Sequence, residues 1–210
     1  PKYDGGIVSR LDSVSFGIVV NQKGHRFYDE GEDFWPKRYA IWGRLVAQQP
    51  SQVAYSIVDN KVRDQFMPSI FPAIEGSSIE DLATKLKIDS QTLKITVEQF
   101  NHAVQHGVYE PSRLEGKKTV GRYPNKTNWS LPLDSPPFLA YPLKPGITFT
   151  YLGLKINEQA KVLNKDDTPF DNVTAAGEIM AGNILGEGYC AGTGMTIGGV
   201  FGRIAGDISR

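Results

Sequence analysis

The chain has 210 residues, enough for one large domain or two small ones with a substantial hydrophobic core. Its 23 Lys and Arg residues balance 23 Asp and Glu residues, so no nucleic-acid partner is expected, since that role needs a basic surface. The single cysteine, Cys190, excludes an intrachain disulfide and a cysteine metal cluster, and it suggests a cytoplasmic protein. No apolar run reaches the roughly 18 residues of a membrane span.

The first half of the sequence alternates between strand and helix patterns. Residues 17–27 predict a β-hairpin that turns at Gly24, and residues 53–58 predict a strand. Helices are expected over three segments that open with a proline or a capping residue: 36–47, 78–87 and 90–107. This arrangement indicates a small α+β unit.

The second half begins with a proline-rich stretch. Seven prolines lie within residues 108–146, and this density favours an ordered, extended loop. We expect a domain boundary near residues 142–146. Beyond it, residues 147–156 predict a strand kinked at Gly153, and residues 161–164 predict a strand that enters a polar hairpin loop.

The C-terminal quarter combines a strand, a glycine-rich loop and a helix. Residues 173–178 predict a buried strand, residues 181–194 are rich in Gly, and residues 195–206 predict a helix with Gly and Ala on one face. In such a segment the backbone can approach a ligand closely, and the N–H groups at the helix start can face an electron-rich atom. Residues 186–191 match a loose G-x-G-x-x-A pattern, but too short a stretch follows for the βαβ unit of about 30 residues that an independent NAD site requires.

Several motifs resemble those of the fumarate reductase/succinate dehydrogenase flavoprotein family. They are the pattern G-x-x-V-N-x-x-G-x-R-F at 17–27, residues 38–48, residues 54–59, the A-A-G-E turn at 175–178 and the helix start at 193–198. The resemblance spans nearly the whole chain and implies an FAD-dependent oxidoreductase of the α+β class. It implies a capping, substrate-binding domain over residues 1–142. Residues 143–210 would be the C-terminal β-rich and helical segment of an FAD-binding α/β domain.

The same resemblance implies that the chain is a fragment or a processed piece of a longer protein. Family members hold the ADP half of FAD with an N-terminal G-x-G-x-x-G segment, which has no counterpart in residues 1–210. We therefore expect this polypeptide alone to be catalytically inert and to bind flavin weakly at best.

The resemblance also implies which residues contact FAD. The acidic residue of the family's A-G-E turn accepts hydrogen bonds from FAD hydroxyls, and Glu178 matches it. The start of the family's last helix stabilises negative charge at the flavin N1/C2=O edge. The matching cofactor-binding positions are Gly192, Thr193, Gly194, Met195, Thr196 and Ile197.

A catalytic residue follows from the same resemblance. In fumarate reductases an Arg ten residues before a matching Gln delivers or takes the proton at the substrate carbon. Counting back from Gln48 leads to Arg38. An Arg also holds carboxylates with two parallel hydrogen bonds, which such a substrate needs. Tyr189 is the second candidate for the base.

Departures from the fumarate reductase pattern change the expected substrate. Phe149 stands where the family has a carboxylate-binding His, and Tyr189 stands where it has an Arg. Succinate or fumarate chemistry is therefore not expected. Three segments, 29–34, 146–153 and 188–198, most resemble the tricarballylate dehydrogenase branch. This resemblance implies oxidation of a small polycarboxylate, tricarballylate, to cis-aconitate. The expected substrate-binding positions are Arg10, Thr148, Phe149 and Thr150.

Two other interpretations remain open. The first is a 3-ketosteroid dehydrogenase-like enzyme with a Tyr base and an apolar pocket, which Tyr189, Tyr151 and Phe149 support. The second is a non-catalytic binding module. The electron acceptor, whether a protein or a quinone pathway, is left undetermined. His102 and His106 fall four residues apart on the predicted helix 90–107, but no third ligand accompanies them and no metal is expected.

Overall fold

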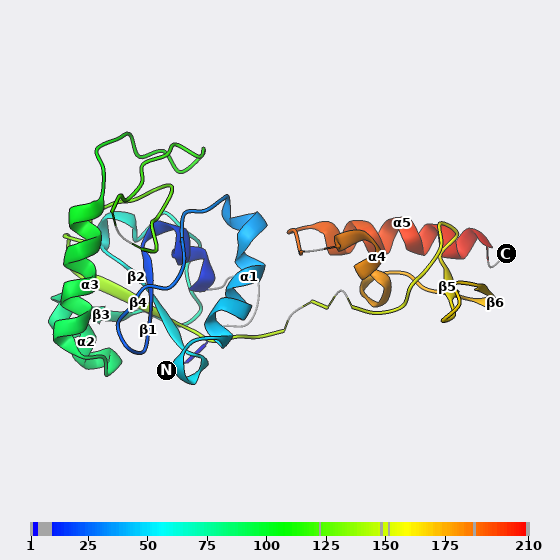
Figure 1. Cartoon of the computed structure of the whole chain (residues 1–210), viewed down its shortest axis with the longest axis horizontal. Coiled ribbons are helices and arrows are strands. Elements are labelled where there is room, and N and C mark those ends of the chain that lie inside the picture. Colours follow the sequence, from blue (N-terminus) through cyan, green and yellow to red (C-terminus); the bar gives the residue numbers. More distant parts are fainter. Residues whose placement is uncertain are drawn as a thin grey trace. The chain divides into compact units, whose positions relative to one another are not determined.

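In the computed structural model the chain divides into two compact units, residues 1–146 (unit 1) and residues 147–210 (unit 2) (Figure 1). The structure describes residues 2–3, 10–121, 123–147, 149–150, 152–186 and 188–208. Helices and strands occur together in the chain, which confirms the α+β class.

Unit 1 is built on a four-stranded antiparallel sheet with the order β1-β2-β4-β3. The strands are β1 (Ile18–Asn21), β2 (Ala54–Val58), β3 (Ile74–Gly76) and β4 (Phe138–Leu143). Every residue of β1, β2 and β4 except Asn21, Ser56 and Pro142 is a buried apolar residue, and those three are buried as well. The sheet is therefore covered on both faces.

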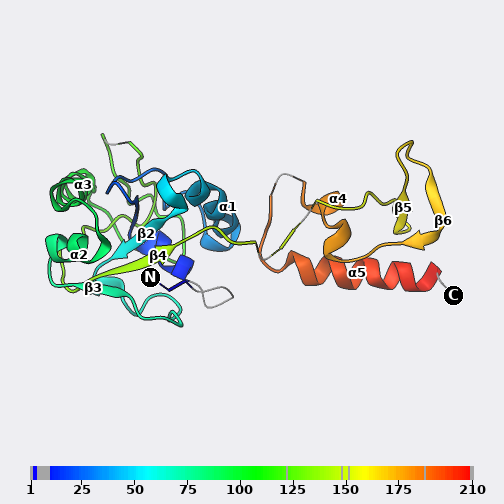
Figure 2. The same cartoon turned by 90° about the horizontal axis from the view of Figure 1, so that it is seen from below.

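Helices supply that cover. One core cluster joins Ile18 and Ile57 of the sheet to Leu82 of α2 (Ile79–Leu86) and Leu93 of α3 (Ser90–Ala103). Another joins Val19 to Trp42 of α1 (Trp35–Ala47), together with residues of η1 (Arg10–Phe16). Because neighbouring strand residues point to opposite faces, α2 and α3 lie on one face and α1 on the other (Figure 2).

The helix starts follow the sequence closely. The predicted helices at 36–47 and 78–87 are confirmed as α1 and α2. Ser78 caps α2, because its hydroxyl accepts a hydrogen bond of 3.1 Å from the Asp81 N–H. Asp89 caps α3 in the same way, accepting 2.8 Å from the Thr92 N–H. Two 3₁₀ turns, η2 (Pro50–Gln52) and η3 (Asn60–Val62), flank β2.

Three expectations for unit 1 need correction. The helix expected to reach Gly107 ends at Ala103, since Val104 is extended and forms a bridge with Thr119. His106 consequently lies outside the helix that carries His102. The hairpin at 17–27 turns at Gly24 as predicted, but its returning arm makes only the single bridge from Arg26 to Val20.

The third correction concerns the proline-rich stretch, which contains the interior strand β4. Pro142 lies within this strand, opposite Tyr55 of β2. A proline has no N–H for a ladder, but β3 pairs only with residues 138–140 of β4. At Pro142 the strand has a neighbour on one side only, and the proline is tolerated there.

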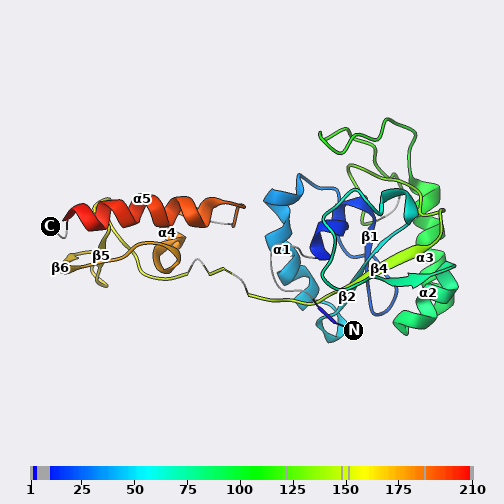
Figure 3. The same cartoon turned by 180° about the vertical axis from the view of Figure 1, so that it is seen from behind.

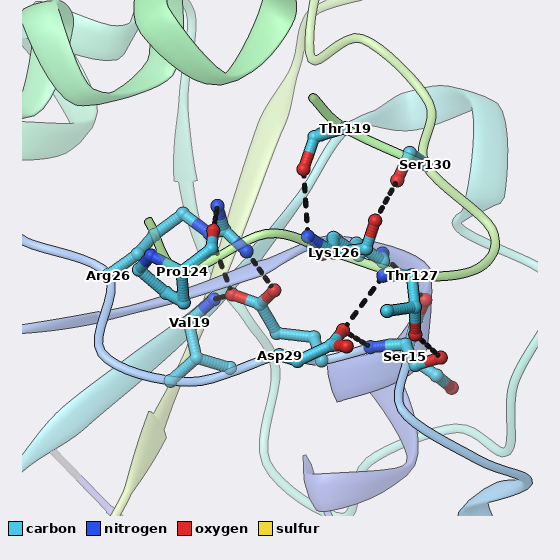
Figure 4. Close-up of polar contacts among 12 residues, drawn as sticks. Ser15, Val19, Arg26, Asp29, Thr119, Pro124, Lys126, Thr127 and Ser130 are labelled. Carbon is cyan, nitrogen blue, oxygen red and sulfur yellow. Dashed lines mark hydrogen bonds and ion pairs between the residues drawn. The ribbon is translucent and has the colours of Figure 1, made fainter. Parts of the chain in front are cut away.

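A buried polar cluster attaches the proline-rich stretch to the start of unit 1 (Figure 4). Lys126 is fully buried, and its Nζ donates to the carbonyl oxygens of Ser15 (2.8 Å) and Gly17 (2.7 Å). Burial lowers the pKa of Lys126 to about 8. Beside it, Arg26 forms an ion pair of 2.6 Å with Glu30 and donates 2.7 Å to the Pro124 carbonyl. The bonds from Lys126 to Ser15 and Gly17 and from Arg26 to Pro124 join segments that are about a hundred residues apart in the sequence.

Unit 2 is a two-stranded ribbon with helices (Figure 3). Its elements are β5 (Lys161–Leu163), β6 (Pro169–Thr174), η4 (Glu178–Met180), α4 (Gly182–Leu185) and α5 (Thr193–Ile208). A small core includes Ile156, Val162, Met180 and Ile197. The strand at 161–164 and the final helix are confirmed. No helix in the described part of the chain is long and apolar enough to span a membrane.

Two strand predictions in unit 2 are wrong. The described residues of 147–155 form no strand, and only Ile156 bridges to Val162. The Leu154 N–H instead donates 2.8 Å to the Ile179 carbonyl, so this segment is bonded to the η4 turn. The strand expected over 173–178 ends at Thr174, and most of β6 is exposed rather than buried.

Candidate functional site

The first candidate residue, Arg38, lies in the first turn of α1, where Pro36 suits the opening of a helix. Its guanidinium Nη2 forms an ion pair with Glu32 Oε1. The other oxygen of that carboxylate, Oε2, accepts a hydrogen bond of 2.8 Å from the Tyr28 hydroxyl. Glu32 therefore holds Arg38 and is itself held by Tyr28.

This contact changes the acidity of both partners of Glu32. The hydrogen bond to Glu32 raises the pKa of Arg38, and burial followed by the Glu32 contact raises the pKa of Tyr28. Arg38 thus carries its charge firmly. Its Nε is buried and has no hydrogen-bond partner within the described residues, while the side chain as a whole is 33% exposed. A guanidinium that is held by Glu32 and is partly exposed suits an incoming carboxylate.

In unit 2 the start of α5 is formed by small residues. The Thr193 hydroxyl donates 2.6 Å to the Cys190 carbonyl and closes the turn before the helix. Gly177 and Gly192 both have a φ of +83°, and a Cβ at either position would meet no atom within 4 Å. The space beside these two glycines is therefore open to a ligand, and Gly192 directly precedes the free N–H groups of a sixteen-residue helix.

Glu178 lies at the start of η4 and is bonded to Thr150. The Thr150 N–H and hydroxyl donate to the same carboxylate oxygen, Oε1, at 2.7 and 2.8 Å. These bonds, the backbone one first, lower the pKa of Glu178, so the carboxylate stays ionised. Since both bonds go to Oε1, Oε2 is left available to a ligand hydroxyl.

Phe149 and Tyr189 form an aromatic pair next to the helix start. Their ring centroids are 5.0 Å apart with an interplanar angle of 46°. A Cβ on Gly194 would come within 2.8 Å of the Phe149 ring, so the glycine allows the ring to approach the helix. The two positions at which the fumarate reductase pattern has a His and an Arg are thus filled by rings that contact each other.

The structure brings some of the expected site residues together and separates others. Phe149, Thr150, Glu178, Tyr189 and Gly194 are linked by direct contacts in unit 2, whereas Arg38 belongs to unit 1. The three residues after Gly194 have different surroundings. Met195 is 90% exposed, whereas Ile197 is 4% exposed and packs in the core. The Thr196 hydroxyl donates a hydrogen bond of 3.4 Å to the Gly192 carbonyl.

Three expected positions fall outside what the structure describes. Thr148 and Tyr151 are not among the described residues, and for Arg10 only the backbone at the start of η1 is described.

Two partners of the site, Tyr28 and Glu32, were not identified as site residues from the sequence. Glu32 lies in the acidic run 29–33, which offered the only signal of its presence.

The residues of unit 2 fit the flavin that the sequence motifs imply. An ionised carboxylate suits ribityl or ribose hydroxyls, and the open glycine backbone allows close approach. The N–H groups and dipole at the start of α5 suit the electron-rich edge of the isoalloxazine ring.

Comparison with known proteins supports this fit. The family described as "FAD binding domain" matches residues 10–197 of the chain. NADH:fumarate oxidoreductase of Klebsiella pneumoniae is 31% identical over 195 residues, which cover 90% of this chain and 19% of that protein. A 3-oxosteroid 1-dehydrogenase of Mycobacterium tuberculosis is 27% identical over 204 residues, covering 86% of this chain and 36% of that protein.

A solved structure extends the likeness to three dimensions. The open conformation of a flavocytochrome c3 fumarate reductase superimposes with a TM-score of 0.65 at 26% identity, over 95% of this chain and 33% of that one. The chain therefore spans about a fifth to about a third of the length of these relatives. With a family match that covers most of its residues, the chain belongs to the FAD binding domain family.

Proposed function

We propose that the protein containing this chain is an FAD-dependent oxidoreductase acting on a CH–CH bond of a polycarboxylate, with tricarballylate, oxidised to cis-aconitate, as the first candidate substrate. The observation that carries this proposal is Arg38, a firmly charged guanidinium that is held by Glu32 and is 33% exposed. The fumarate oxidoreductase named among the relatives supports the class of reaction.

In this proposal the two units have different roles. Unit 1 is the capping domain and supplies Arg38, and unit 2 is the returning segment of the FAD domain. FAD, when bound, accepts a hydride from the substrate carbon. Glu178 and the start of α5 hold the cofactor, with Thr150 keeping the Glu178 carboxylate in place.

The acid–base roles follow from the contact between Arg38 and Glu32. Because this contact raises the pKa of Arg38, the guanidinium stays charged, which suits the binding of a carboxylate and makes it a poor proton acceptor. Tyr189 is therefore retained as the second candidate for the base in the oxidative direction. Arg10 and Thr148 complete the proposed set of carboxylate contacts.

The substrate proposal rests on the altered positions 149 and 189. The Phe149–Tyr189 pair provides no positive charge where the fumarate reductase pattern has two carboxylate ligands. A dicarboxylate such as succinate would lose those contacts. A tricarboxylate has a further anionic group that Arg38 can bind.

One observation favours a second candidate, a 3-ketosteroid dehydrogenase-like enzyme. The same Phe149–Tyr189 pair presents apolar ring surface together with a phenol, which suits a ring substrate and a Tyr base. A relative at 27% identity is named 3-oxosteroid 1-dehydrogenase. The two candidates differ in the charge of the substrate and can be separated directly.

The test is anaerobic mixing of the complete flavoprotein with tricarballylate, succinate or a 3-ketosteroid, followed at the oxidised flavin absorption band. We expect tricarballylate to bleach the band and succinate to do so far more slowly, because position 149 and position 189 carry no carboxylate ligand. Equal rates with succinate would return the protein to the fumarate reductase branch. Bleaching by the steroid alone would establish the second candidate, and bleaching by none of the three would favour a binding module.

A further inference from the structure

A cavity of about 560 Å³ opens within unit 1, in the size range of small-molecule sites. It lies between η1, the start of α1, the turn after η3 and two parts of the proline-rich stretch. All the residues used below belong to unit 1. None of them is among the residues proposed above for substrate or cofactor binding.

Aromatic rings form much of the cavity wall. Two ring pairs line it, Phe16 with Phe66 at 5.7 Å and Phe34 with Trp129 at 5.9 Å between centroids. A fifth ring belongs to Trp35, whose indole N–H donates 3.1 Å to Asp12 Oδ1. Segments distant in the sequence thus converge to enclose one space with ring surfaces.

The polar lining of this cavity is acidic. Asp12 and Asp64 line it, and no Lys, Arg or His is found among the described lining residues. The second oxygen of Asp12, Oδ2, is buried and lacks a hydrogen-bond partner in the described part of the chain. A buried acceptor without a donor is unfavourable, and burial raises the pKa of Asp12 accordingly. A cation close to this carboxylate would stabilise its ionised form.

We propose that the cavity binds an organic ammonium ion, whose charge is attracted to the Asp12 and Asp64 carboxylates while its apolar body packs against Trp35 and Trp129. A cation is attracted to the faces of aromatic rings as well as to carboxylates. Lys37, which is not among the lining residues, has its Nζ 5.8 Å from the centroid of the Phe34 ring and 3.4 Å from Asp33, so its charge is already paired. Asp64 adds a second negative charge at the same cavity.

Other classes of ligand fit less well. A carboxylate ligand would face Asp12 and Asp64 with no cation among the described lining residues to receive it. An uncharged apolar ligand would fill the space but leave the two carboxylates without a cation. The ammonium ion matches both the acidic lining and the aromatic wall.

Tryptophan fluorescence gives a direct assay. Trp35 and Trp129 line the cavity, whereas the third tryptophan, Trp42, is only 1% exposed and packs in the core below α1. The probes are benzylammonium, benzyl alcohol and benzoate, which share one ring and differ in charge. In the chain 1–210 we expect saturable quenching by benzylammonium, with affinity about 10-fold or more above that of benzyl alcohol, as expected for a hydrogen bond to a charged group. Benzoate should not quench.

Variants distinguish the contribution of the carboxylate charge to binding from the contribution of the cavity's shape. Asp12→Asn keeps the shape and an acceptor for the Trp35 indole but removes the charge, so we expect the 10-fold preference for benzylammonium to disappear while weak binding of benzyl alcohol persists. Asp64→Asn should reduce the preference to a smaller extent. Asp171→Asn, on the exposed strand β6 of unit 2, is the matched control and should leave binding unchanged.

Several results would overturn the proposal. Equal affinity for benzylammonium and benzyl alcohol would show a cavity without preference for cations. An Asp12→Asn protein that folds, as judged by circular dichroism, and retains the preference would exclude Asp12 as the ligand. Calorimetry on the complete protein is the final check, because binding to the chain 1–210 but not to the complete protein would mean that the cavity is filled there and is no ligand site.

Discussion

Replacing Arg38 by Lys in the complete flavoprotein should slow reduction of the flavin by substrate by about 100-fold or more, because the two parallel hydrogen bonds that position the substrate carboxylate are lost. Lys keeps the charge but loses the planar fork of the guanidinium. Stopped-flow absorbance under anaerobic conditions measures this rate. The variant should still fold and retain its flavin, since Arg38 lies in the first turn of α1 and its side chain is 33% exposed.

The matched control is Arg44→Lys, in the last turn of the same helix. This exposed arginine has no place in the proposed site, so its replacement should leave the rate of flavin reduction unchanged. If the Arg38 and Arg44 variants are reduced at the same, near wild-type rate, Arg38 has no part in the chemistry.

The largest effect on stability is expected for Glu30→Gln, which should lower the free energy of unfolding by about 3–5 kcal/mol, as breaking a buried ion pair does. Glu30 is 3% exposed, pairs with Arg26 at 2.6 Å and accepts 2.8 Å from the Val19 N–H. Glutamine fills the same volume but leaves the Arg26 charge buried without its partner. Urea unfolding of the chain 1–210, followed by circular dichroism and tryptophan fluorescence, measures the change.

Glu75→Gln provides the comparison, because Glu75 pairs with Arg63 at the surface and both side chains are more than two-fifths exposed. Such pairs contribute about 0–1 kcal/mol. A Glu30 variant no less stable than the Glu75 variant would show that the buried pair is not a principal link within unit 1.

Local signals in the sequence predicted the helices of unit 1 well. A proline at the start of α1, and Ser78 and Asp89 as caps of α2 and α3, act within one turn and need no knowledge of distant contacts. Strands depend on partners elsewhere. β4 was not predicted because it contains Pro142, which fits in the strand only because β3 pairs with residues 138–140 and not with the end of β4. The residues after 147 have a strand-like sequence, but they are bonded to the η4 turn.

The candidate site shows the same difference between local and long-range signals. Arg38 and Glu178 could be predicted because motif spacing marks them. Their partners could not, since Thr150 reaches Glu178 across 28 residues, and nothing in the local sequence indicates that contact. The hydrogen bond from Trp35 to Asp12, 23 residues apart, could not be predicted for the same reason. The acidic aromatic cavity that these residues line could not be predicted either.

The most direct test that this chain is part of an FAD-dependent enzyme is a comparison of flavin content. The complete protein and the chain 1–210 are purified side by side, and their flavin is measured by absorption spectroscopy. Glu178 and the start of α5 offer contacts to the ribityl and isoalloxazine parts of FAD, whereas the ADP half needs a glycine-rich loop followed by a βαβ unit. We expect the complete protein to carry stoichiometric FAD and the chain 1–210 to be colourless. A complete protein without flavin would contradict the proposed function, and a yellow, stoichiometric preparation of 1–210 would contradict the proposed division of the cofactor site.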